Sequence, residues 1–86
     1  MNQKRVGIIG IFVKERDPAA QAVNRCLSEH DGLVVARLGV PYRERGLSVI
    51  SVVVDGTNDQ IGALAGKLGS IASVTVKSML APVEKE

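Results

Sequence analysis

The chain has 86 residues, of which 45% are hydrophobic and 2% aromatic, so it is long enough for one small domain with a core of Val, Ile, Leu and Ala. Its 11 cations and 9 anions are scattered and leave a net charge of only +2, which excludes the basic surface of a typical nucleic-acid-binding protein. The single cysteine excludes an internal disulfide, and no apolar run is long enough for a signal peptide or a membrane span, so we expect a cytoplasmic protein.

The first part of the chain predicts a strand followed by a helix. Residues 6–13 are a continuous apolar run rich in β-branched side chains, as in a strand that is covered on both faces. Asp17 and Pro18 are typical of a helix start. Apolar residues then recur at helical spacing up to the Asp-Gly pair at 31–32, where the helix should end.

Two further apolar runs predict a β-hairpin. Residues 33–40 and 47–55 have strand-like composition. The charged connector 41–45 is followed by Gly46, which can adopt the positive φ that a hairpin turn needs. So short a connection makes the two strands antiparallel neighbours.

The stretch 57–79 predicts a capped helix and a final strand. Thr57 and Gln60 have the spacing of a capping box, and Gly69 stands where a left-handed residue would end the helix. Residues 74–77 then alternate with period two, as in a strand. The apolar stripe of this helix consists of Ile61, Leu64, Ala65 and Leu68.

The same helix carries a second stripe without side chains, formed by Gly62, Gly66 and Gly69. A glycine inside a helix costs about 1 kcal/mol relative to alanine, so the stripe needs a reason. A bare stripe lets another backbone or a ligand come close. It indicates either tight packing, on the chain's own sheet or on a neighbouring subunit, or a ligand cleft beside the helix.

The order βαββαβ predicts a ferredoxin-like α+β sandwich, with a four-stranded antiparallel sheet and two helices on one face. We expect one domain over residues 1–86, with a loose tail from about residue 81. Alternation in the second strand places Val34, Ala36, Leu38 and Val40 together on the side of the helices. The opposite face is apolar as well, and its candidate interface residues are Leu33, Val35, Leu47, Val49 and Val53. We therefore predict a homodimer or homotetramer that buries roughly 600–800 Å² of this face per chain.

Candidate chemistry is sparse. Cys26 and His30 lie four residues apart on the first helix, a spacing that allows two metal ligands, but the chain has no further Cys or His. The alternative reading puts Cys26 in the core and His30 at the negative end of the helix dipole. The serines lack an evident His partner, and no phosphate-binding glycine motif is present. We therefore expect no enzyme, no metal and no cofactor.

The hairpin connector offers a possible anion site. Tyr42 is flanked by Arg43 and Arg45, and Arg37 precedes them on the strand. Guanidinium groups pair with carboxylates through two hydrogen bonds. The alternative reading is a solvated hairpin whose charges keep the end of the sheet soluble. Lys67 likewise either meets a ligand carboxylate or is a solvated helix lysine.

Three strings carry a resemblance to a known family: residues 37–46, 55–59 and, most specifically, 61–69, IGALAGKLG. The chain resembles a family of stand-alone bacterial proteins, the iron-only hydrogenase system regulators. That family is similar to ACT-like regulatory domains and to the C-terminal domain of the nickel-responsive repressor. The resemblance implies a ferredoxin-like fold, a dimer or higher oligomer, and a regulatory, transcription-related or sensing role.

Departures from the relatives narrow this expectation. The turn at residues 14–18 lacks the glycine with which ACT domains bind amino acids. The chain also lacks the nickel regulator's strand ligands and its DNA-binding arm, so we do not expect direct DNA binding.

Our leading hypothesis is a non-enzymatic, ACT-like regulatory module that self-associates and binds a small ligand at the subunit interface. The candidate ligand residues combine the hairpin with the second helix: Gly39, Tyr42, Arg43, Gly62, Gly66 and Lys67. The alternative is a structural adaptor that docks a partner protein and has no small-molecule ligand.

Overall fold

The described residues, 3–14 and 17–83, form strands and helices in the order that the sequence predicts. In the computed structural model, residues 1–2, 15–16 in the predicted turn and 84–86 in the predicted tail lie outside this description. Short 3₁₀ helices, η1 (Asp31–Leu33) and η2 (Arg43–Arg45), precede and follow the second strand. The main elements are β1 (Lys4–Lys14), α1 (Asp17–Glu29), β2 (Val34–Tyr42), β3 (Leu47–Thr57), α2 (Asn58–Gly69) and β4 (Val74–Leu80).

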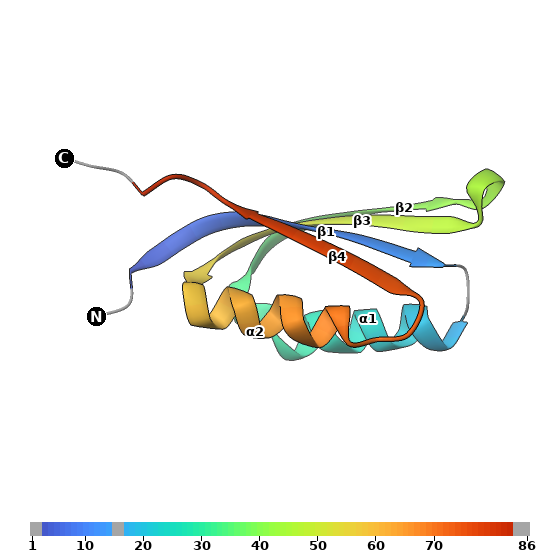
Figure 1. Cartoon of the computed structure of the whole chain (residues 1–86), viewed down its shortest axis with the longest axis horizontal. Coiled ribbons are helices and arrows are strands. Elements are labelled where there is room, and N and C mark those ends of the chain that lie inside the picture. Colours follow the sequence, from blue (N-terminus) through green and yellow to red (C-terminus); the bar gives the residue numbers. More distant parts are fainter. Residues whose placement is uncertain (1–2, 15–16, 84–86) are drawn as a thin grey trace.

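The strands form one antiparallel sheet in the order β2-β3-β1-β4. Strands β2 and β3 are neighbours, as the short connector predicts, and Gly46 takes a φ of 65° at the end of η2. Figure 1 shows α1 and α2 packed side by side on one side of the sheet. The ferredoxin-like sandwich is therefore confirmed.

The core lies between the helices and the inner face of the sheet. Each large apolar side chain buried there contributes about 1.5–3 kcal/mol to folding. Neither helix in the described ranges has the length and apolar character that crossing a membrane demands. The most completely buried side chains are Ile9, Ile11, Val13, Val23, Val52, Val54, Leu64 and Leu68.

Cys26 belongs to this core, as the interpretation without a metal predicts. Burial raises the pKa of its thiol above the ordinary value of 9.0; nearby Lys67 opposes this shift and Glu29 adds to it. The thiol is therefore a small hydrophobic group here rather than a nucleophile.

The predicted capping box at the start of α2 is confirmed. The Thr57 hydroxyl oxygen accepts a hydrogen bond from the Gln60 backbone N–H at 3.1 Å. The Gln60 Oε1 accepts one from the Thr57 backbone N–H at 2.9 Å. Two N–H groups that the helix leaves without partners are thus satisfied, and β3 passes into α2 with no linker.

The predicted end of α2 is wrong in one respect. Gly69 is not left-handed; the helix continues through it to Ser70, which has a right-handed φ of −80°. The Ser70 hydroxyl donates to the Lys67 carbonyl at 2.7 Å and so satisfies the helix end without a glycine. The left-handed conformation falls on Ser73 instead, at a φ of 72°.

The predicted facing of β2 is also wrong, because a β-bulge interrupts its alternation. Val34 pairs with Val54, whereas Ala36 pairs with Val53 on the other face, so one extra residue is accommodated at Val35. The bulge reverses the facing of the rest of the strand. Thus Ala36, Leu38 and Val40 lie on the face away from the helices.

The glycine stripe of α2 does not pack on the chain's own sheet. A Cβ placed on Gly62, Gly66 or Gly69 would meet no atom within 4 Å, and all three residues are exposed. Packing on the chain's own sheet is therefore excluded as the reason for this stripe. Contact with a neighbouring subunit and a ligand cleft remain as explanations.

Gly56 differs sharply from these glycines. A Cβ there would lie 2.6 Å from Leu33 Cδ2 and 2.9 Å from Gln60 Oε1. We expect Gly56→Ala to lower the free energy of unfolding by about 1–3 kcal/mol, because the new methyl overpacks this contact. Urea denaturation measures the change, and an unchanged midpoint would contradict the contact.

Gly62→Ala is the matched substitution in open space. We expect it to raise the free energy of unfolding by about 0.5–1 kcal/mol, since alanine is the better helix former and nothing crowds its methyl. The same urea denaturation measures it. A loss of stability instead would mean that the stripe packs against a second copy of the chain.

The raised pKa of Cys26 has a measurable consequence at alkaline pH. A thiol that holds its proton more tightly when folded contributes stability below its unfolded pKa, and that stability is lost as pH rises through the folded pKa. We expect wild-type stability to fall relative to that of Cys26→Ala as pH rises above 9.0, with parallel curves at neutral pH. A constant difference across the whole range would contradict burial of the thiol.

Candidate functional site

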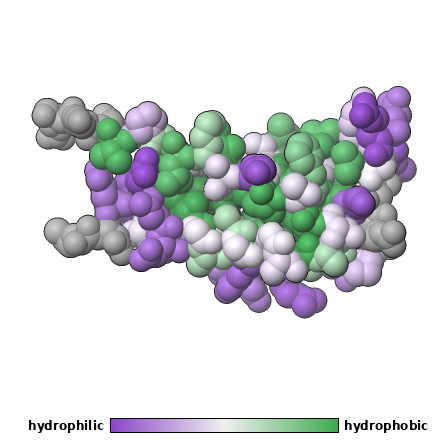
Figure 2. Space-filling view, in the orientation of Figure 1, coloured by the Kyte–Doolittle hydropathy of each residue, from purple (hydrophilic) through white to green (hydrophobic). Residues whose placement is uncertain are grey.

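The sheet leaves one face without helices, and this face is apolar. Along the register, Ile8 pairs with Val53 and Met79, and Phe12 pairs with Val49, so their side chains share one side. Ile8 is 42% exposed and Phe12 47%. In Figure 2 the outline that follows this side of the sheet is mostly green to pale. We call this surface the outer face and define it by Val6, Ile8, Phe12, Leu38, Val40, Val49, Val53 and Met79.

Three of the five candidate interface residues lie on this side of the sheet: Leu47, Val49 and Val53, all half-buried. Leu33 lies in η1 and packs against the core. Val35 sits in the bulge at the start of β2 and is 65% exposed. The bulge brings Leu38 and Val40 to the outer face, which the sequence analysis placed on the opposite one. The interface itself stays a prediction.

The candidate ligand residues do not form one site within a single copy. The η2 turn, which carries Arg43 and follows Tyr42, lies at the far tip of the β2–β3 hairpin, away from α2 (Figure 1). Gly39 lines a hollow of about 230 Å³ between β2, β3 and α1. On α2, Gly62, Gly66 and Lys67 are exposed. A site that uses both groups would need a second copy of the chain.

Arg37 makes its hydrogen bond with α1 and not at the hairpin tip that carries Arg43 and Arg45. Its Nη2 donates to Asn24 Oδ1 on α1 at 2.8 Å. This bond ties β2 to α1 along the inner side of the sheet.

His30 lies just after the last residue of α1 and is half-buried. Its Nδ1 makes a 2.9 Å hydrogen bond with the Cys26 carbonyl, which satisfies one of the free carbonyls at the helix end. The described residues contain no group of three or more His, Cys, Asp or Glu side chains that could hold a metal ion.

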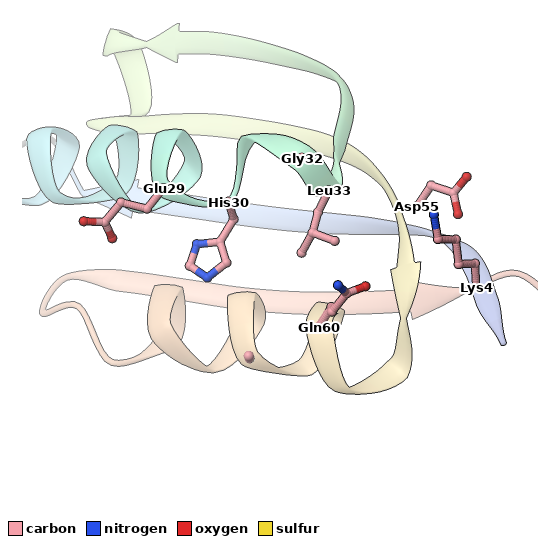
Figure 3. A pocket seen from close by; sticks show the side chains of 8 residues that line it. Lys4, Glu29, His30, Gly32, Leu33, Asp55 and Gln60 are labelled. Atoms are coloured by element: carbon pink, nitrogen blue, oxygen red, sulfur yellow. The ribbon is translucent and has the colours of Figure 1, made fainter. Parts of the chain in front are cut away.

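A cleft of about 410 Å³ opens where the end of α1 meets the start of α2. In Figure 3 the His30 ring reaches across the gap between the two helices, with Leu33 and Gln60 beside it. We call it the helix-end cleft; its lining residues are Lys4, Glu29, His30, Gly32, Leu33, Asp55, Gln60 and Ala63.

This cleft is not among the sites predicted from the sequence. Its residues come from both helices, η1 and two strands, so no local string contains the site. The available signal was that His30 ends one helix while Gln60 begins the other. Helices on the same face of a sheet that run in opposite directions bring such ends together.

A family model matches residues 5–78, and the family, TM1266-like, is described as "Iron-only hydrogenase system regulator, putative". Among solved structures, the chain is similar to protein TM1266 from Thermotoga maritima, with 39% identity and a TM-score of 0.91. That alignment covers 93% of this chain and 100% of the other. No curated protein matches.

More distant structures share the fold. One is the ACT domain of GTP pyrophosphokinase from Chlorobium tepidum, with 16% identity, a TM-score of 0.76, and coverage of 90% of this chain and 100% of that one. Another is SnoaB, a cofactor-independent oxygenase from Streptomyces nogalater, with 12% identity, a TM-score of 0.58, and coverage of 98% and 97%. Such likeness shows the fold alone, since an ACT domain and an oxygenase share it. With a family model over residues 5–78 and a relative at 39% identity, the chain belongs to the TM1266-like family and has the ACT-like fold that its sequence predicts.

Proposed function

We propose that this chain is a non-enzymatic regulatory module of an iron-only hydrogenase system. It self-associates through the outer face as a homodimer or homotetramer, and it responds to a small ligand. The family assignment supports the regulatory role. The observation that carries self-association is the outer face itself, on which Leu38 and Met79 are each 66% exposed.

The size of the outer face supports a second copy as its occupant. Strands lie about 4.8 Å apart and rise about 3.3 Å per residue, so the described sheet presents on the order of 600–700 Å². Stable interfaces bury about 600–1,000 Å² per partner, so this area lies at the lower end of that range. A two-fold interface sets the same patch of both copies against each other, which suits a surface that is mainly apolar and carries only Ser51, Thr75 and Lys77 as polar groups near its centre.

The low stability expected of so small a domain also favours a second copy on the outer face. A domain of this size buries only about 60–65% of the surface of its unfolded chain, which leaves it marginally stable alone. Removing apolar surface from water contributes about 25 cal/mol per Å². Covering the outer face therefore stabilises the fold and removes an aggregation-prone surface at once.

The non-enzymatic reading is supported by the surroundings of the chain's histidine. In the part of the chain that the structure describes, His30 bonds to a main-chain carbonyl rather than to a serine or cysteine side chain. The buried thiol of Cys26, with its raised pKa, is likewise a poor nucleophile.

A structural adaptor is the second candidate. The outer face would then dock a partner protein instead of another copy, and its apolar character favours that reading as well. The mass of the free protein in solution distinguishes the two.

Light scattering of purified protein tests the proposal. We expect the wild type at two or four times the 9.1 kDa chain mass. We expect Phe12→Glu to shift the mass toward one chain, because it places a charge in an apolar interface. Gln21→Glu, on the exposed side of α1, is the charge-matched control and should behave as the wild type.

Circular dichroism of each variant checks that the fold persists. A wild type that remains a monomer at high concentration would overturn self-association and favour the adaptor. Equal masses for wild type and Phe12→Glu would move the interface away from the outer face.

A further inference from the structure

The helix-end cleft contains two polar side chains whose hydrogen-bonding roles are set by the main chain. His30 and Gln60 each use one polar atom on a backbone partner. The remaining polar atom of each is then chemically defined. The hydrogen-bonding role of each of these two remaining atoms, donor or acceptor, therefore follows from the fold alone.

For His30 the partner is the Cys26 carbonyl, which can only accept a hydrogen bond. Nδ1 must therefore carry the proton, and the neutral ring then has an unprotonated Nε2, which accepts. Figure 3 shows one ring nitrogen on the side of α1 and the other directed toward α2. His30 thus offers an acceptor to the cleft.

For Gln60 the partner is the Thr57 backbone N–H, which can only donate. Oε1 must face that N–H, so the orientation of the amide is determined by chemistry. In Figure 3 the amide nitrogen lies on the side of Leu33 and the oxygen on the side of β3. Gln60 thus offers donors to the cleft.

Between these two groups the wall is apolar and small. Leu33 and Ala63 line it, and Leu33 is half-buried against the core. Gly56 lets the Leu33 and Gln60 side chains approach the β3 backbone, since a Cβ on residue 56 would collide with both of them. The charged rim holds Glu29, Asp55 and Lys4, two acids and one base.

We propose that the helix-end cleft binds a small planar heterocycle of the nucleobase class, uncharged or cationic. The ring lies against Leu33 and Ala63, an amino group of the ligand donates to His30 Nε2, and a ring nitrogen accepts from the Gln60 amide. The volume of about 410 Å³ is that of a small-molecule site. The acidic excess on the rim disfavours a phosphate.

This inference rests on the proposed function for its biological role, because it names a ligand class for the sensing module. It is separate from the hairpin residues and needs no second copy of the chain. Every lining residue comes from one chain.

The test is a titration of ¹⁵N-labelled protein, followed by the backbone and side-chain amide signals. Adenine is the probe, because it carries an amino group beside a ring nitrogen. We expect it to shift the Gln60 side-chain NH₂ signals and the signals of the cleft residues. 6-Dimethylaminopurine, which lacks the amino protons, should bind at least about fivefold more weakly. Adenosine monophosphate should also bind more weakly than adenosine.

Two variants separate recognition from folding. Gln60→Glu keeps an oxygen for the Thr57 N–H but removes the donating NH₂ group. His30→Asn keeps a donor for the Cys26 carbonyl but removes Nε2. We expect each to weaken adenine binding at least about fivefold while the spectrum stays dispersed. Gln21→Glu is the control and should bind adenine as the wild type does.

No shift with adenine up to its solubility limit would overturn the proposal, and so would shifts of equal size in the wild type and both variants. Light scattering of the same samples measures assembly independently. A loss of adenine binding with intact oligomers counts against the ligand class alone. A monomer that still binds adenine counts against self-association alone.

Discussion

A four-stranded sheet has two faces, and α1 and α2 can shelter only one of them. On the inner face, side chains such as Ile9 and Val52 are fully buried. On the outer face, equally apolar residues such as Ile8 and Met79 remain exposed. Exposing an apolar surface of this size to water is unfavourable in free energy, and this is the physical reason to expect a second copy of the chain.

The junction of β3 and α2 connects the fold to the cleft. Thr57 ends the strand and caps the helix at once, so no loop separates the two elements. The same capping bond that stabilises the first turn of α2 also orients the Gln60 amide, and the missing side chain of Gly56 makes room for it. Stability and the polarity of the cleft therefore depend on one short segment, which leaves little freedom to change one without the other.

Much of the fold could be predicted because its signals are local. The capping box of Thr57, the hairpin glycine Gly46 and the apolar periodicities act over a few residues each. The facing of β2 could not be predicted, because the bulge at Val35 leaves no local trace. Gly69 ends α2 but is not left-handed, because the Ser70 hydroxyl satisfies the Lys67 carbonyl by another route. The candidate ligand residues were paired across elements that one copy does not bring together.

The sequence by itself determined the element order, the antiparallel hairpin, the apolar character of both sheet faces and the family resemblance. Each of these depends on neighbours along the chain or on composition. Only the tertiary structure decided which β2 residues reach the outer face, that the glycine stripe points into open space, and that His30 and Gln60 line one cleft. These features depend on register and on the meeting of distant helix ends, and such long-range geometry follows from packing the whole chain at once.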